Sequence, residues 1–185
     1  MIVESSILPI PRANIDTDQI IPASKLTGIS KTGLGEFLFA GMPGGAALLA
    51  EHAGAQIVLA LDNFGCGSSR EHAVWALVDR GFRAVVAPSF ARIFNENAYA
   101  NGLVPIALPA ETVQALFDAQ RIRIDVESQT LEDDRGSRYA FDLDPLRKRF
   151  LLDGGFLEFL AGRIPAIRAW EALRSGAGPD VVEQA

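Results

Sequence analysis

Residues 64–72, Phe-Gly-Cys-Gly-Ser-Ser-Arg-Glu-His, contain five kinds of reactive or charged group: hydroxyl, thiol, guanidinium, carboxylate and imidazole. The segment follows a short apolar run at 57–61 and precedes apolar residues at helical spacing from Ala73 onward. A glycine-rich turn from a strand end into a helix start points backbone N–H groups at an anion, and the helix dipole reinforces them. Arg70 adds a guanidinium that can hold a carboxylate through two hydrogen bonds. The segment therefore predicts a site for a small, multiply charged acid.

The two serines also have a purely structural interpretation, because Ser68-Ser69-Arg70-Glu71 fits a Ser-x-x-Glu capping box. A cap alone does not require two flanking glycines with Arg70 and His72 beside them, so the block as a whole indicates a site. A catalytic serine needs a base, and His72 lies within one helical turn of both hydroxyls. We prefer a role for His72 in orienting the loop. The chain has no Gly-x-Ser-x-Gly nucleophile elbow, which disfavours a hydrolase.

Three further groups have both a chemical and a structural interpretation. Cys66 is either a thiol activated at a helix N-terminus or a small residue that fills a tight turn, and we favour the second. Asp16-Thr17-Asp18 places two carboxylates two residues apart, which suits a metal with oxygen ligands and an Asx turn equally well. His52 is expected at a solvated helix end rather than on a metal.

The composition bounds the class of protein. The 185 residues, 49% hydrophobic and 22% charged, predict one globular domain over residues 1–185, with 176–185 as a frayed tail. A net charge of −6 without a basic block argues against nucleic acid as a partner. The N-terminus lacks a signal-peptide pattern and no apolar stretch reaches the length of a membrane span, so we expect a cytoplasmic protein with no membrane partner. One cysteine and two histidines are too few for an iron–sulfur cluster or a structural zinc site, so another polypeptide would have to supply a cluster.

The elements that must position these groups predict an α/β fold with parallel strands. Short apolar runs at 57–61, 83–87 and 103–107 alternate with helical patterns at 70–80, 89–100 and 111–119. An extended segment is expected at 7–10 and a short helix at 46–53. The six glycines between positions 23 and 45 predict a long irregular loop.

The pattern changes after residue 121. Apolar residues alternate with polar ones around Ile124 and again around Phe141, and the polar stretch 132–137 separates them. This period of two predicts a β-hairpin or ribbon. Residues 145–174 return to helical spacing.

Three blocks of the chain resemble the small subunits of 3-isopropylmalate dehydratase, a family of the aconitase superfamily. They are residues 14–22, 63–73 and 87–94, and they occur in the expected order. The resemblance implies a swivelling three-layer β/β/α domain of the aconitase C-terminal type that docks on a separate large subunit carrying a [4Fe–4S] cluster. Together the two subunits would isomerise 2-isopropylmalate and 3-isopropylmalate through 2-isopropylmaleate, in leucine biosynthesis. The cluster iron would act as Lewis acid for the departing hydroxyl.

The resemblance also implies roles by position. Ser68 would be the catalytic base, whose alkoxide takes the carbon-bound proton next to a carboxylate. Ser69 would help to bind that carboxylate, and Arg70 would clamp it. The other residues expected to bind substrate are Gly67, Asp16, Thr17, Leu26 and Ile29, and those expected to support the site are Asn63, Glu71 and His72.

Residues 25–32 would read the side group of the substrate, with Leu26 and Ile29 accommodating an isopropyl group. Two alternatives stay open at this point. The same machinery could act on another substituted malate, such as a methyl- or dimethyl-malate. The chain could also be a stand-alone module that binds carboxylates and needs no large partner.

Overall fold

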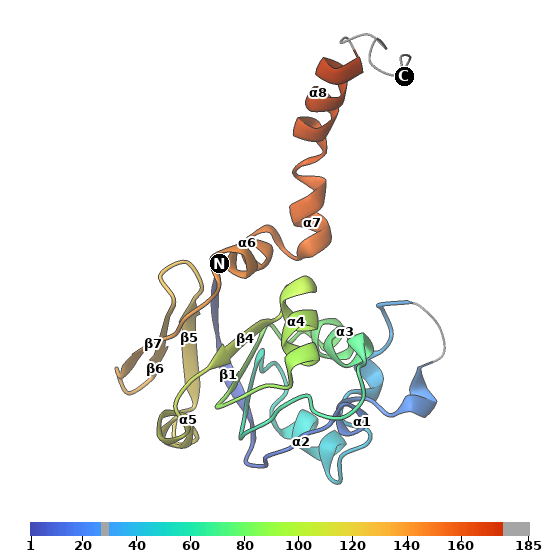
Figure 1. Cartoon of the computed structure of the whole chain (residues 1–185). Helices are drawn as coiled ribbons and strands as arrows, with labels where there is room; N and C mark the ends of the chain where they lie inside the picture. Colours follow the sequence, from blue (N-terminus) through green and yellow to red (C-terminus); the bar gives the residue numbers. More distant parts are fainter. Residues whose placement is uncertain (27–29, 176–185) are drawn as a thin grey trace.

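The computed structural model describes residues 1–26 and 30–175 of the chain. Within them, seven strands form one curled sheet in the order β4-β3-β2-β1-β5-β6-β7 (Figure 1). The strands are β1 (Ile2–Ile10), β2 (Ile57–Ala60), β3 (Ala84–Ala87), β4 (Val104–Ala107), β5 (Arg121–Asp125), β6 (Thr130–Asp133) and β7 (Arg138–Ala140). Strands β1 to β4 run parallel, whereas β5, β6 and β7 add in antiparallel fashion.

Helices follow most of the strands. They are α1 (Thr17–Ile20), α2 (Gly45–Glu51), α3 (Glu71–Arg80), α4 (Arg92–Ala100), α5 (Ala110–Leu116), α6 (Pro145–Asp153), α7 (Phe156–Ala161) and α8 (Ile164–Ser175). The glycine-rich stretch after α1 contains two short 3-10 turns, η1 (Ala23–Lys25) and η2 (Gly35–Phe37). The predicted frayed tail, 176–185, lies outside the described residues. No described helix combines the length and the apolarity that a membrane crossing requires.

The alternation of side chains along β2 shows the layers. Val58 points to one face and packs in the same core as Leu77 of α3, together with residues of α1, α2 and α4. Leu59 points to the other face and packs in the same core as Ile124 of β5. The parallel strands are therefore a middle layer, buried on both faces, which explains their continuous apolar runs. This arrangement confirms the predicted α/β class with β/β/α layering.

Two elements differ from the predictions. The predicted hairpin after residue 121 is a three-stranded meander, because β6 takes up residues that the polar pattern assigned to a turn. Asp133 at the end of β6 is buried, and its carboxylate accepts backbone N–H bonds from Arg135 (3.0 Å) and Ser137 (2.8 Å). The helix expected from residue 89 begins only at Arg92, because the preceding residues pair with the loop after β2.

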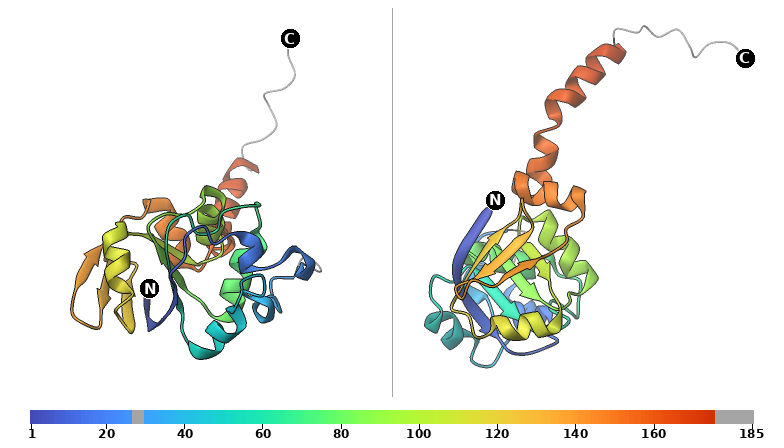
Figure 2. Two further views of the ribbon diagram at one scale, coloured as in Figure 1. Left: turned by 90° about the horizontal axis from the view of Figure 1, so that it is seen from below. Right: turned by 90° about the vertical axis from the view of Figure 1, so that its left-hand side faces the viewer.

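The parallel arrangement brings the carboxyl ends of β1, β2 and β3 to the same edge of the sheet. The loop after β2 contains Ser68, Ser69 and Arg70, and the loops after β1 and β3 lie beside it. At the other end of the chain, α6 packs on the body and α7 contacts α6 and α4. From there α7 and α8 extend away from the body as a projecting arm in Figure 1 and in the right-hand view of Figure 2.

Candidate active site

Backbone hydrogen bonds join the three loops that follow β1, β2 and β3. The N–H of Thr17 donates to the carbonyl of Cys66 (2.9 Å), and the N–H of Phe64 donates to the carbonyl of Ser89 (3.1 Å). Ligands of open α/β sheets bind beyond the carboxyl ends of the strands. The loop with the serines is therefore held from both sides at the edge where a ligand is expected.

Ser68 and Ser69 are both exposed at this edge. Helix α3 begins at Glu71, and its N-cap, Arg70, has an extended backbone (φ −127°) with no side-chain cap. The interpretation of the two serines as a capping box is therefore wrong. No acceptor or donor in the described part of the chain engages either hydroxyl, so both are available to a ligand.

A cavity of about 190 Å³ opens in front of the serines. Its lining consists of Thr17, Gly65, Gly67, Ser68, Ser69, Arg70, Ala91, Arg92, Ile93 and Phe94. Two arginines, Arg70 and Arg92, therefore line a space of small-molecule size. Arg92 was not singled out as a site residue from the sequence. Its position at the start of the helix that follows the buried strand β3 is the signal that could have found it.

Arg70 is only partly free. Its Nη1 donates to the carboxylate of Asp18, and the side chains of Arg70 and Asp18 are 19% and 55% exposed. The hydrogen bond from Arg70 holds the pKa of Asp18 below its ordinary value. The remaining N–H groups of the guanidinium have no protein acceptor among the residues that the structure describes. Asp18 thus orients Arg70 and leaves part of its donor fork for a ligand.

Asp16 and Thr17 support the loop from below. Asp16 is the N-cap of α1, where its Oδ1 accepts from the N–H of Gln19 (2.7 Å) in a complete capping box. Thr17 is buried, and its Oγ1 donates to the carbonyl of Ser68 (3.0 Å). Of the two interpretations of Asp16-Thr17-Asp18, the structure favours the local turn over the metal site. Within the described ranges no cluster of His, Cys, Asp or Glu is suited to hold a metal ion.

Gly65 and Gly67 give the loop its shape, because both have positive φ, +77° and +88°. A Cβ on Gly65 would lie 2.2 Å from Cγ of Phe94, so the loop passes too close to α4 for any side chain there. Cys66 lies half-buried between the glycines. Burial raises the pKa of its thiol, and the nearby charge of Asp16 raises it further. A protonated thiol in a tight turn agrees with the interpretation of Cys66 as a small space-filling residue.

The three predicted supporting residues lie around the loop. The amide of Asn63 donates to Oδ1 of Asn14 (2.8 Å) and so links the loops after β2 and β1. The His72 ring lies 4.6 Å from the Trp75 ring, and no hydrogen bond of the described residues joins it to a serine. Its contacts fit a residue that orients the helix start rather than a base.

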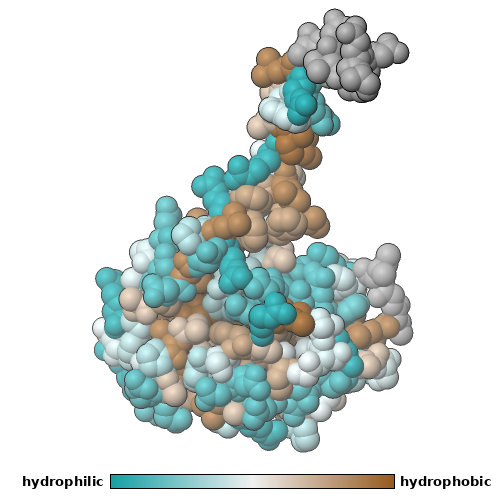
Figure 3. Space-filling model, in the orientation of Figure 1, coloured by the Kyte–Doolittle hydropathy of each residue, from teal (hydrophilic) through white to brown (hydrophobic). Residues whose placement is uncertain are grey.

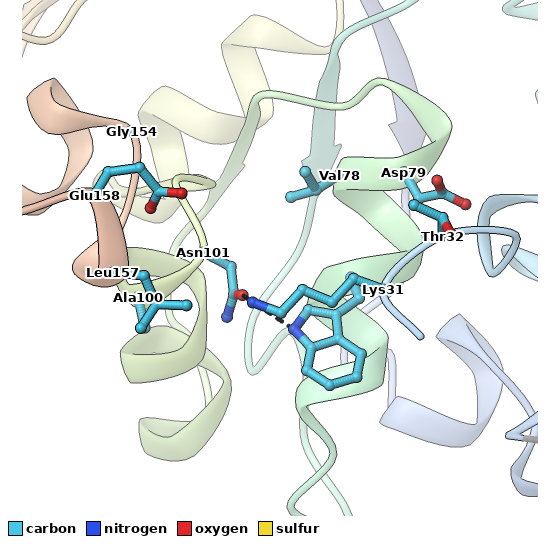
Figure 4. Close-up of a pocket in the computed structure, with 10 residues that line it drawn as sticks. Lys31, Thr32, Val78, Asp79, Ala100, Asn101, Gly154, Leu157 and Glu158 are labelled. Atoms are coloured by element: carbon cyan, nitrogen blue, oxygen red, sulfur yellow. Dashed lines mark hydrogen bonds between the residues drawn. The ribbon is translucent and has the colours of Figure 1, made fainter. Parts of the chain in front are cut away.

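Glu71 is held by Asn101, whose side-chain amide uses all four of its hydrogen-bonding positions. The Oδ1 atom of Asn101 accepts from Lys31 Nζ (2.9 Å) and Trp75 Nε1 (3.0 Å), as Figure 4 shows. Its Nδ2 atom donates to Glu71 Oε1 (2.7 Å) and to the carbonyl of Asn97 (2.9 Å). This network ties α3 to the end of α4, beside a second cavity of about 320 Å³. Lys31 and Thr32, from the segment predicted to read the substrate side group, line this cavity, whereas Ser68, Ser69 and Arg70 do not.

The residues expected to read the side group are less well placed. Leu26 is half-buried and packs against the helix-side core. Ile29 lies outside the described residues. The role of residues 25–32 therefore stays a prediction. His52 is the C-cap of α2, as the interpretation of a helix end predicts.

Comparisons with known proteins match this geometry to a family. A family model of the aconitase C-terminal domain matches residues 3–111. A 3-isopropylmalate dehydratase small subunit from Anoxybacillus flavithermus is 48% identical over 179 residues, which cover 89% of this chain and 92% of that protein. The chain belongs to this family. Two further 3-isopropylmalate dehydratase small subunits support this assignment. The protein from Novosphingobium aromaticivorans is 44% identical, and the match covers 82% of this chain and 78% of that protein. The protein from Roseobacter denitrificans is 43% identical, and the match covers 92% of this chain and 93% of that protein.

A solved structure of a 3-isopropylmalate dehydratase has a similar fold. The crystal structure of 3-isopropylmalate dehydratase (LeuD) from Methanocaldococcus jannaschii superposes with a TM-score of 0.74 at 28% identity, and the match covers 96% of this chain and all of that one. The predicted resemblance is thereby confirmed. The description "small subunit" implies that members of the family work with a large-subunit partner.

Proposed function

We propose that this chain is the small subunit of a 3-isopropylmalate dehydratase, a cytoplasmic hydro-lyase of leucine biosynthesis that is active only with its large subunit. The observation that carries the proposal is the pair of exposed, unengaged hydroxyls of Ser68 and Ser69 beside Arg70 in one cavity. This set of donors suits a substituted malate, and the family supplies the reaction.

Ser68 is the proposed base. In the dehydration of 2-isopropylmalate to 2-isopropylmaleate, a proton leaves the carbon next to a carboxylate and hydroxide leaves the neighbouring carbon; water then adds back with the opposite placement. A serine alkoxide requires fixed positive charge and N–H donors around it. Arg70 and Arg92 border the same cavity and supply that charge.

Ser69 and Arg70 are the proposed carboxylate-binding pair. Asp18 accepts a hydrogen bond from Nη1 of Arg70, which restrains the guanidinium and leaves its other donors for a ligand in the cavity that Arg70 lines. Thr17 Oγ1 donates a hydrogen bond to the carbonyl of Ser68 and thereby restrains the backbone that carries the Ser68 hydroxyl. Preorganised donors of this kind contribute more to the rate than mobile ones, because they need no reorganisation during the reaction.

The residues of this chain do not fit a [4Fe–4S] cluster. Such a cluster takes several thiolates, and the chain has one cysteine, Cys66, whose thiol has a raised pKa. We therefore assign the cluster to the large subunit, and the roles above rest only on side chains of this chain.

Reconstitution of the full chain with a large subunit tests the proposal. Turnover is monitored through the ultraviolet absorbance of the unsaturated intermediate. We expect no turnover by the isolated chain. Once the large subunit is added, we expect isopropylmalates to be turned over in preference to methyl- and dimethyl-malate. Hydration by the chain alone would contradict the proposal, as would dicarboxylate binding with no dependence on a partner. Preference for a smaller alkylmalate would reassign the substrate.

A further inference from the structure

Exposed apolar side chains are concentrated at the C-terminal end of the described chain. Eleven large hydrophobic residues of the described part are exposed, and all but Ile2 and Ile93 lie between positions 146 and 173. They are Leu146, Leu152, Phe156, Leu157, Leu160, Ile164, Ile167, Trp170 and Leu173. Figure 3 shows the corresponding brown surface along the projecting helices.

The projecting arm, defined as α7 and α8 (residues 156–175), leaves most of its apolar side chains exposed, and Phe156 at its start packs edge-on against Phe150 of α6 with 5.2 Å between the ring centroids. Phe159 is the residue of α7 that is buried, whereas Trp170 is 56% and Leu173 is 78% exposed. In α8, Ile164, Ile167, Trp170 and Leu173 recur every three residues, so each lies beside the next on the helix surface. Exposed apolar patches of this extent mark interaction sites.

The face around the active site offers little apolar surface by comparison. Asp18, Ser68, Ser69 and Arg92 are exposed there, and Ile93, at 41%, is the exposed large apolar side chain of the cavity. Stable protein interfaces bury about 800 Å² on each partner around an apolar core. The polar face can orient a substrate between two subunits, whereas most of the exposed large apolar side chains of the described residues lie outside it, between positions 146 and 173.

We propose that the arm is the anchor by which this small subunit holds its large subunit, a proposal that rests on the proposed function. Arg163 stacks on Phe159 (4.2 Å) and Arg174 on Trp170 (4.8 Å), so guanidinium groups border the apolar side chains. The matching surface of the large subunit is therefore an apolar groove with carboxylates at its rim. Subunit affinity and catalysis then use different surfaces of this chain.

The test compares substitutions of equal chemistry in the arm and in the body. Ile167→Gln combined with Trp170→Gln alters the arm, and Ile2→Gln alters an exposed isoleucine at the start of β1 as the matched control. The dissociation constant for the large subunit is measured by light scattering without substrate, and kcat is measured at saturating small subunit. We expect the arm variant to bind at least tenfold more weakly with unchanged kcat, and Ile2→Gln to behave as wild type.

Leu173→Gln is the second arm variant, since a side chain 78% exposed contributes little to folding, and it should also weaken binding. An unchanged dissociation constant in both arm variants would overturn the proposal. A second result would also overturn it: the isolated wild-type chain is a dimer, the arm variants are monomers, and the affinity for the large subunit is the same in all of them. Wild-type binding without turnover would instead contradict the proposed function and leave the anchor in place.

Discussion

Substitution of Gly65 by alanine tests whether the loop with the serines is shaped by its close approach to α4. At φ +77° an L-residue loses about 1–2 kcal/mol relative to glycine. The new Cβ would also lie 2.2 Å from Cγ of Phe94, a ring that is 2% exposed and packs edge-on against Phe64 at 5.2 Å. Forcing extra volume into such a core costs roughly 1–3 kcal/mol. We therefore expect the free energy of unfolding to fall by about 2–5 kcal/mol in total.

Gly136→Ala is the matched control, because Gly136 has a φ of +85° but no atom within 4 Å of the added Cβ. It should lose only the conformational part, about 1–2 kcal/mol. Urea unfolding of the two variants measures the difference, and turnover in the reconstituted enzyme shows whether Ser68 has moved. Gly65→Ala should reduce kcat, whereas Gly136→Ala should not. Equal losses of stability in the two variants would refute the packing argument.

Three further predictions concern the groups around the loop. Arg70→Lys keeps the positive charge, but a lysine cannot hydrogen-bond to Asp18 and hold a substrate carboxylate through two bonds at the same time. KM should therefore rise about 10- to 100-fold, which corresponds to the loss of one charge-assisted hydrogen bond. An unchanged KM would argue against a carboxylate clamp by Arg70. Because the pKa of the Cys66 thiol is raised, alkylation by iodoacetamide at pH 8 should be slower than alkylation of a free thiol, and its rate should still increase at alkaline pH values where the rate of a free thiol has levelled off. Labelling as fast as that of a free thiol at pH 8 would contradict this assignment. Leu26→Arg should shift preference toward substrates with an extra carboxylate in a panel of malates, and an unaltered profile would show that residues 25–32 do not read the side group.

The alternation of apolar runs and helical patterns was sufficient to predict the parallel strands and their helices. Local pattern failed where distant contacts decide the conformation. The capping box at Ser68 is complete in sequence, yet Thr17 binds the carbonyl of Ser68 and Asp18 binds Arg70, so the backbone stays extended and α3 begins at Glu71. Asp133 was assigned to a turn because of its charge, but its carboxylate is satisfied inside the fold by nearby backbone N–H groups.

Most of the candidate site was predictable because its chemistry is contiguous in sequence. The parts that were missed are supplied by other segments. Asp18 and Arg70 are separated by 52 positions, and Asn101 lies 30 positions from Glu71. Arg92 reaches the cavity only because the loops after β2 and β3 are hydrogen-bonded to each other. Such pairings depend on the strand order, which no local pattern specifies.

The most direct test of the account is the turnover of Ser68→Ala in the reconstituted two-subunit enzyme, with Ser69→Ala beside it. Ser68 is exposed and its hydroxyl has no partner among the described residues, so its removal should leave the free energy of unfolding within about 0.5 kcal/mol of wild type. If Ser68 is the base, kcat should fall by roughly 10²- to 10⁴-fold with little change in KM, whereas Ser69→Ala should act mainly on KM. Turnover of Ser68→Ala at the wild-type rate would remove Ser68 from the mechanism and contradict the central claim.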